Sequence, residues 1–132
     1  MVDWVFDIPF VEGGRSEDGA DCWGLVVLFY EKELGISLPK YEDVVLNIGK
    51  NHEKTMDQVD AILDTLTLFE PTDTPEYGDV VLLNMLGRPV HTGIVIAPNQ
   101  FIHTTHKTNV AVENYSELKW NRRVQGFYRL IR

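Results

Sequence analysis

The sequence predicts an α+β domain, with a central helix near the start packed on an antiparallel sheet of about five strands. A nearly continuous apolar run follows Cys22, and residues 55–66 have helical spacing. From Asp79 onward, apolar residues recur in short segments separated by turn residues. Helices followed by strands are typical of α+β folds. With 132 residues and 44% hydrophobic content, residues 1–132 are expected to form a single domain around one core.

The first predicted helix covers Cys22 to Leu34. Nearly every residue before Glu31 is apolar, so this helix should be buried on most of its circumference. Gly35 and Pro39 follow it, and both residue types commonly mark a helix end. We therefore expect it to be the central helix.

The second predicted helix is amphipathic and peripheral. Its start matches a capping box, Thr55-Met56-Asp57-Gln58, and apolar residues follow at helical spacing up to Leu66. The preceding segment, 41–54, has no clear pattern. Residues 70–77 contain Pro71 and Pro75, and they are expected to form a loop.

Five strands are predicted in the second half of the chain. They are expected near residues 79–85, 90–96, 100–105, 109–113 and 126–131. Turns are expected at Gly87-Arg88 and Pro98-Asn99, because Gly, Pro and Asn favour turn conformations. One face of the resulting sheet should pack on the first helix.

The chain is acidic, and its charge is unevenly distributed. Its net charge of −8 argues against nucleic acid as a partner. Residues 1–79 contain 5 Lys/Arg and 18 Asp/Glu, a balance of 5 − 18 = −13, whereas residues 80–132 contain 7 and 2, a balance of +5. Two solvated surfaces of opposite sign are the simplest interpretation, and a docking surface for a larger assembly is the alternative.

The amino-terminal residues and the single cysteine bear on the cellular location. One cysteine cannot form an internal disulfide framework. Residues 1–7 lack the basic and apolar regions of a secretory signal, and no apolar run is long enough to span a bilayer. We therefore expect synthesis in the cytoplasm without a signal peptide, and no membrane partner.

Cys22 is the strongest candidate for a catalytic residue. It opens the first helix, and a free thiol pKa of about 8.5 falls to roughly 3.5–7.5 at a helix amino terminus or beside an imidazolium. A cysteine nucleophile also needs a base within reach and a third group that orients the base. His91 and His103 are the candidates. An inert buried cysteine and two core histidines are the alternative.

The length of the turn around Pro98 decides whether the two histidines share a face of the sheet, since successive side chains on a strand alternate. If Ala97 pairs with Gln100, His103 lies opposite Ile94 and away from His91. If Ile96 pairs with Gln100, His103 lies opposite Gly93, diagonal to His91 on the same face. We predict this second, three-residue loop, with Asn99 or Gln100 in a left-handed conformation.

The remaining polar candidates have simpler interpretations. His106 is expected in an exposed turn, His52 in a loop, and Asp79 at a turn or strand start. A zinc site is disfavoured, because only His103-x-x-His106 has ligand-like spacing. We expect neither a metal nor another cofactor.

Several motifs together resemble the NlpC-type cell-wall peptidases, a family of papain-like cysteine enzymes that hydrolyse stem peptides of peptidoglycan. The resemblance covers nearly the whole chain, in order. It is carried by Gly13-Gly14, Asp21-Cys22-Trp23-Gly24, Gly78-Asp79-Val80-Val81, His91-Thr92-Gly93-Ile94-Val95 and Asn99-Gln100-Phe101-Ile102-His103.

The resemblance implies a papain-like NlpC-type fold and a Cys-His-His triad. Cys22 would be the nucleophile, His91 the base that takes its proton, and His103 the residue that orients His91. Members of the family commonly carry a tyrosine twelve residues before the thiol, where this chain has Phe10, which has no hydroxyl to donate to an oxyanion. The supporting residues are expected to be Asp21, Trp23, Gly24, Phe10 and Gly93, with Trp23 either narrowing the cleft or simply packing.

Trp23 also points to a subgroup. Gly13-Gly14-Arg15, Asp21-Cys22-Trp23-Gly24-Leu25 and Leu34-Gly35-Ile36-x-Leu38-Pro39-x-Tyr41 resemble versions found in tail-tip proteins of bacteriophages and prophages. The resemblance implies a tail-associated endopeptidase, made in the host cytoplasm, that cleaves the bond between D-glutamate and the diamino acid, with tail-tip proteins as further partners. The alternatives are an assembly module with little or no turnover, and an amidase or acyltransferase acting on lipids or small amides.

Overall fold

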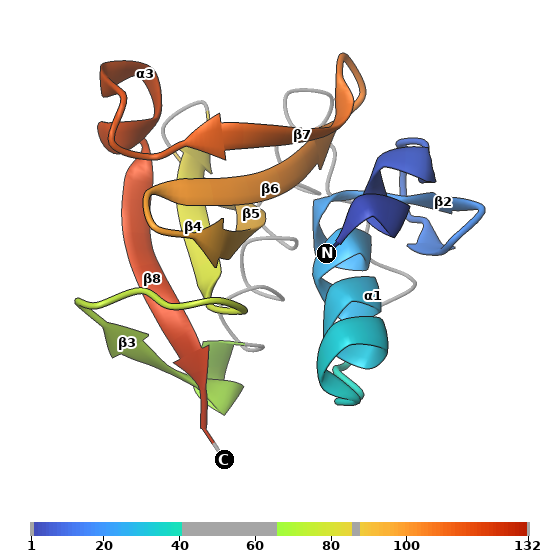
Figure 1. The fold of residues 1–132 in the computed structure, drawn as a ribbon, viewed down its shortest axis with the longest axis horizontal. Coiled ribbons are helices and arrows are strands. Elements are labelled where there is room, and N and C mark those ends of the chain that lie inside the picture. Colours follow the sequence, from blue (N-terminus) through green and yellow to red (C-terminus); the bar gives the residue numbers. More distant parts are fainter. Residues whose placement is uncertain (1, 41–65, 86–87, 132) are drawn as a thin grey trace.

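The computed structural model describes residues 2–40, 66–85 and 88–131, and it shows one long helix packed on an antiparallel sheet (Figure 1). Among the described residues the sheet has six strands in the order β3-β8-β4-β5-β6-β7, and β1 and β2 form a separate hairpin. The α+β prediction is confirmed, with one strand more than expected. The elements are η1 (Asp3–Asp7), β1 (Arg15–Ser16), β2 (Gly19–Ala20), α1 (Cys22–Leu34), η2 (Leu66–Leu68), β3 (Phe69–Thr72), β4 (Val80–Met85), β5 (Arg88–Ala97), β6 (Gln100–Thr105), β7 (Asn109–Asn114), α3 (Leu118–Asn121) and β8 (Val124–Leu130).

Helix α1 has the predicted bounds and the predicted burial. Its nine residues 22–30 are all buried, as the unbroken apolar run indicated. Asp21 caps the amino end by accepting a hydrogen bond from the Gly24 amide, 2.9 Å away. Gly35 ends the helix with a φ of 65°, a left-handed conformation that costs glycine little.

The six-stranded sheet has two buried faces. One face packs on α1 through alternate residues of β4 to β7, and we call it the helix face. The opposite side, the far face, packs a smaller cluster around Trp120 of α3. The helix-face cluster includes Val80, Leu82, Ile94, Ile102 and Val110, and the far-face cluster contains Val81, Leu83, Phe101 and Trp120.

The β5–β6 hairpin reaches the predicted alignment by a different turn. Ala97 pairs with Gln100, so the prediction of a three-residue loop starting from Ile96 is wrong. A bulge between Val95 and Ala97 then shifts the register, so that Ile94 pairs with Ile102. His103 therefore falls opposite Gly93, as predicted. The bulge adds one residue to β5, which has the same effect on the alignment as the extra residue of a three-residue loop. Asn99 has the expected left-handed conformation, with a φ of 66°.

The prediction of a loop over residues 70–77 is wrong at its start. Residues 69–72 form β3, which pairs with β8 and places Pro71 opposite Tyr128. A proline is tolerated there because β3 is an edge strand. Four predictions fall on segments outside the described residues: the second helix, the connector 41–54, His52 and the turn residue Gly87. The other residue of that predicted turn, Arg88, is instead the first residue of β5.

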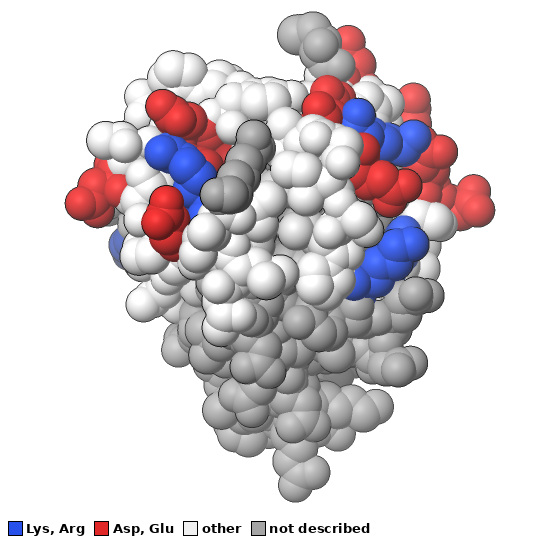
Figure 2. Space-filling view, turned by 90° about the horizontal axis from the view of Figure 1, so that it is seen from below, with Lys and Arg blue, Asp and Glu red and all other residues white. Residues whose placement is uncertain are grey.

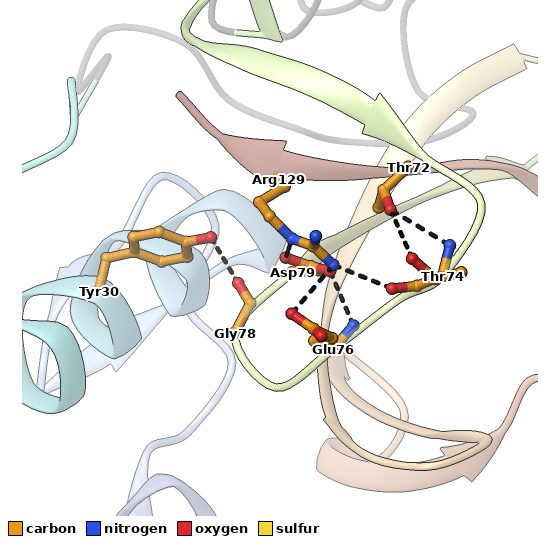
Figure 3. A network of polar contacts seen from close by, with 7 residues as sticks. All are labelled: Tyr30, Thr72, Thr74, Glu76, Gly78, Asp79 and Arg129. Atoms are coloured by element: carbon orange, nitrogen blue, oxygen red, sulfur yellow. Dashed lines mark hydrogen bonds and ion pairs between the residues drawn. The ribbon is translucent and has the colours of Figure 1, made fainter. Parts of the chain in front are cut away.

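A polar network ties the carboxyl-terminal half of α1 to the sheet (Figure 3). The Tyr30 hydroxyl donates to the Gly78 carbonyl, and the next residue, Asp79, accepts two hydrogen bonds from Arg129 of β8, at 3.1 and 2.8 Å. Gly78 has a φ of 91°, which favours glycine at this turn. Asp79 thus has the predicted structural role before β4. A cavity of about 470 Å³ beside the network lies about two helical turns from Cys22.

The surface shows no single field of one sign in the view of Figure 2. Charged side chains lie there in two groups, each containing both signs, with uncharged residues between them. No described helix is long and apolar enough to cross a membrane.

Candidate active site

The amino end of α1 is fixed by a buried ion pair. Asp21 is fully buried, and its Oδ1 accepts hydrogen bonds from Arg15 Nη1 at 2.6 Å and from the Gly24 amide. Its Oδ2 accepts from the Gly13 amide at 3.1 Å. Asp21 therefore holds the first turn of the helix that begins at Cys22. Sequence reasoning did not assign a partner to Asp21, although Arg15 lies in one of the motifs it singled out.

The two residues after Cys22 pack tightly. A Cβ on Gly24 would lie 2.1 Å from the Gly14 carbonyl oxygen, so only glycine fits between the helix and this loop. Trp23 is buried, and its indole N–H donates to the Pro39 carbonyl at 2.8 Å. Of the two roles expected for Trp23, the structure shows packing.

His91 and His103 are joined directly, as the predicted alignment required. His91 Nε2 lies 2.8 Å from His103 Nδ1, and His103 Nε2 lies 3.1 Å from Glu113 Oε2. The three residues come from neighbouring strands, β5, β6 and β7, and they share the far face of the sheet. Glu113 is a third member of this chain that sequence reasoning missed. Its signal was the β6–β7 register, which places it diagonal to His103.

Close packing holds His103 in place. Its ring contacts Trp120 in a T-shaped arrangement with centroids 4.8 Å apart, and it contacts Phe101 at 5.3 Å. Gly93 lies opposite His103, and a Cβ there would come within 2.8 Å of both the Phe101 ring and the Ile102 carbonyl oxygen. The absence of a side chain at Gly93 thus leaves room for these groups.

Cys22 lies on the helix-face side of the sheet, next to Thr92. Beyond the Ile94–Ile102 pair the β5–β6 ladder ends, and the amide and hydroxyl of Thr92 face the sulfur. Thr92 directly follows His91, so the thiol and the base meet the same short segment of β5 from its two sides. Within the part of the chain that the structure describes, no hydrogen bond joins Cys22 to His91.

The ionisation of the thiol is opposite to the expectation from helix position. Burial, together with the smaller effect of the Asp21 carboxylate, raises the pKa of Cys22 to about 12, against the opposing effects of Thr92 and Arg15. The sequence predicted a lowered pKa because it showed the helix amino terminus and not the depth of burial. The Cys22 thiol is therefore protonated at neutral pH in this state.

Both histidines are neutral at neutral pH. Burial, with smaller contributions from His103 and Arg123, lowers the pKa of His91 to about 3. Burial also lowers the pKa of His103, against the opposing effect of Glu113. A neutral imidazole held through Nε2 keeps Nδ1 as a proton acceptor. An imidazole in this state can accept a proton, as a general base does.

The other candidates do not join this group by a hydrogen bond in the described residues. The Phe10 amide donates to Asn109 Oδ1 at 2.9 Å, and the Phe10 ring contacts His106 with centroids 6.2 Å apart. His106 lies in an exposed turn, as predicted. In residues 2–40, 66–85 and 88–131, no group of three His, Cys, Asp or Glu side chains is arranged to hold a metal ion.

The profile of the NlpC/P60 family matches residues 7–129. The chain belongs to this family. It is 24% identical over 129 residues to the murein DD-endopeptidase MepS/murein LD-carboxypeptidase of Escherichia coli K12, covering 98% of this chain and 58% of that protein. It is 27% identical to the gamma-DL-glutamyl hydrolase of Bacillus subtilis 168, covering 96% of this chain and 26% of that protein. The chain thus spans well under two thirds of either relative.

Solved structures show the same fold at low sequence identity. NlpC1 from Trichomonas vaginalis is 17% identical with a TM-score of 0.66, and the match covers 94% of this chain and 39% of that one. The NlpC/P60 domain of the peptidoglycan hydrolase SagA is also 17% identical, with a TM-score of 0.59 over 98% of this chain and 91% of that one. The papain-like NlpC-type fold predicted from the motifs is confirmed.

In this NlpC/P60 domain, Glu113→Gln is expected to weaken the alignment of the two histidines. Glu113 raises the pKa of His103 against burial, so removing its charge should lower that pKa further. NMR titration of the His103 ring nitrogens measures the shift, and the rate of any reaction that uses His91 as its base is expected to fall about tenfold with the lost charge-assisted bond. Glu117→Gln, which neutralises an exposed acid at the start of α3, serves as the control. An unchanged His103 titration in Glu113→Gln would contradict the role.

Proposed function

We propose that this chain is a cysteine endopeptidase that hydrolyses stem-peptide amide bonds of peptidoglycan. The hydrogen-bonded chain from His91 through His103 to Glu113, beside the helix end that carries Cys22, supports this proposal most directly. The name of the Escherichia coli relative, a murein endopeptidase, supports peptidoglycan as the class of substrate. The bond proposed to be cleaved is the one between D-glutamate and the diamino acid. The name of the Bacillus subtilis relative supports a gamma-glutamyl bond, whereas the Escherichia coli relative is named for DD- and LD-bonds.

The proposed reaction has two steps and uses no cofactor. Cys22 Sγ attacks the peptide carbonyl while His91 takes the thiol proton, and His91 then gives that proton to the leaving amine. Water, activated by His91, hydrolyses the thioester. Because the thiol and the imidazole both start neutral, proton transfer accompanies attack instead of preceding it. His103 holds the His91 ring during both transfers.

The developing oxyanion needs hydrogen-bond donors near Cys22. Phe10 cannot supply a side-chain donor, so the proposed donors are backbone N–H groups at the start of α1. One lost donor of this kind costs about 10²–10³ in rate. We therefore expect a lower rate of peptide cleavage than in relatives that carry tyrosine at the position of Phe10.

The test is mass spectrometry of defined muropeptides after incubation with the protein and, in parallel, with Cys22→Ala. Stem-peptide fragments from the unchanged protein alone are the expected result, and their masses identify the bond. If both proteins fold and neither cleaves, or if Cys22→Ala cleaves equally, the cysteine-peptidase proposal is wrong. Parallel incubation with lipid esters and small amides tests the amidase or acyltransferase alternative.

We also propose that the protein is made in a host cytoplasm and acts as part of a phage or prophage tail. The support is the set of motifs that resemble tail-tip versions, and the contacts between them. Arg15 of the first motif donates hydrogen bonds to Asp21 of the second and to the Lys40 carbonyl within the third, while Trp23 donates to the Pro39 carbonyl. The three motifs thus form one contact unit.

A tail-tip assembly module with the same fold is the second candidate, and Phe10 together with the buried thiol favours it. Electron microscopy of tails labelled with an antibody to the protein tests the location. Labelled tails that digest cell walls only with intact Cys22 would favour the endopeptidase. Labelled tails that assemble and digest normally with Cys22→Ala would favour the assembly module.

A further inference from the structure

Two buried threonine hydroxyls lie on the helix face of the sheet without hydrogen-bond partners in the described residues. They belong to Thr92 of β5, with 0% of its surface exposed, and Thr104 of β6, with 1%. Buried hydroxyls are nearly always hydrogen-bonded in folded proteins, because burial without a partner is unfavourable. Each of the two therefore calls for an explanation.

Only Thr92 has an explanation in its surroundings. Its side chain points to α1, because it pairs across the sheet with Leu82 of the helix-face cluster. Cys22 opens α1 at this place, and Thr92 is the residue whose amide and hydroxyl face the sulfur. A protonated thiol is a weak acceptor, which leaves the hydroxyl without a bond. A thiolate is a charged acceptor, and it would complete the bond.

We propose that Thr92 assists catalysis as a positioning residue. Its hydroxyl donates a hydrogen bond to Cys22 Sγ when the thiol gives its proton to His91. This inference rests on the proposed function and extends it to a residue outside the triad. No bond other than Sγ–H breaks in this step: the proton moves to His91, and Thr92 keeps its own. The hydroxyl thus stabilises the charge that burial and Asp21 oppose.

The fixed charges of Asp21 and Arg15 do not supply such a donor. Asp21, at the helix cap, disfavours the thiolate, and Arg15 favours it but is already bonded to Asp21. His91 receives the thiol proton while its Nε2 stays hydrogen-bonded to His103, so the Thr92 hydroxyl is a second donor in addition to the imidazolium that forms. Thr92 provides both a backbone N–H and a hydroxyl toward the sulfur, and the hydroxyl alone can be removed by substitution.

The experiment measures the rate at which iodoacetamide alkylates Cys22 across neutral and alkaline pH, followed by intact mass. The chain has a single cysteine, so each added mass reports Cys22. Thr92→Val removes the hydroxyl at nearly constant volume, Thr92→Ser keeps it, and Thr104→Val is the matched control for losing a buried unpaired hydroxyl on the same face. Both Val variants are expected to fold at least as stably as the unchanged protein, because each removes an unsatisfied polar group.

Thr92→Val is expected to react about tenfold more slowly at each pH below the thiol pKa, whereas Thr92→Ser and Thr104→Val keep the original rate. If Thr92→Val only loosened the packing, Cys22 would become more accessible and react faster. A rate in Thr92→Val equal to or above the original, or an equal loss in Thr104→Val, overturns the inference. The measurement uses no peptidoglycan, so its failure is distinguishable from a failure to cleave muropeptides.

Discussion

His91→Ala is expected to reduce muropeptide cleavage by about 10²–10⁴-fold, the usual contribution of a general base. The neutral Cys22 thiol cannot attack efficiently without a base, because burial holds its pKa at about 12. Among the described residues, His103 is not available to replace His91, since it is hydrogen-bonded between His91 and Glu113. Initial rates on a defined muropeptide, at matched protein concentration, measure the effect.

His106→Ala is the matched control for the His91 prediction. His106 is exposed in the β6–β7 turn and has no hydrogen bond to the His91–His103–Glu113 chain among the described residues. Its replacement should leave the rate within about twofold, as expected for an exposed side chain away from the chemistry. A His91→Ala protein that folds, as shown by circular dichroism, and still cleaves at the original rate would exclude His91 as the base.

Asp21→Ala is expected to lower the free energy of unfolding by about 3–5 kcal/mol, the usual cost of removing one partner of a buried ion pair. The variant leaves the Arg15 guanidinium buried without its carboxylate. It also removes the cap of α1 and the acceptor for the Gly13 amide. Urea denaturation followed by circular dichroism measures the change, through the midpoint at constant slope.

Asp18→Ala tests whether any lost carboxylate near this helix would have the same effect. Asp18 is exposed in the β1–β2 turn, and only its backbone amide is hydrogen-bonded among the described residues. Its replacement should change the unfolding free energy by no more than about 0.5 kcal/mol. Equal stabilities for Asp21→Ala and Asp18→Ala would show that the buried pair contributes nothing to folding.

Local patterns predicted the elements of the fold well where one physical signal dominated. The unbroken apolar run and Gly35 defined α1 to the residue, because burial on all sides and a left-handed end leave few alternatives. Strand β3 was missed because Pro71 indicates a loop unless one knows that the strand lies at an edge. The turn at Pro98 was misassigned because a bulge and a longer loop give the same downstream alignment.

The sequence was enough to predict which cysteine and histidines form the candidate site, but not the pKa of the cysteine. Strand alternation was enough to bring His91 and His103 together, and the motif placed Cys22 at the helix start. Glu113 needed the β6–β7 register, which sets a partner ten residues away in sequence. The raised pKa of Cys22 depends on how deeply the whole fold buries the sulfur, and no local pattern carries that information.

The hydrogen bond from Tyr30 to Gly78 links the carboxyl-terminal half of α1 to the position of Cys22 at its amino end. The helix is anchored at Asp21 and again at Tyr30, about 12 Å further along. A rigid rod held at two points has a fixed direction, so a tilt at one anchor displaces the other. Substitutions of Tyr30, Gly78 or Arg129 would therefore change the direction of the helix and displace the Cys22 sulfur, although none of them replaces a reacting group. Activity can thus change through substitutions at this distant turn, with the active-site residues unchanged.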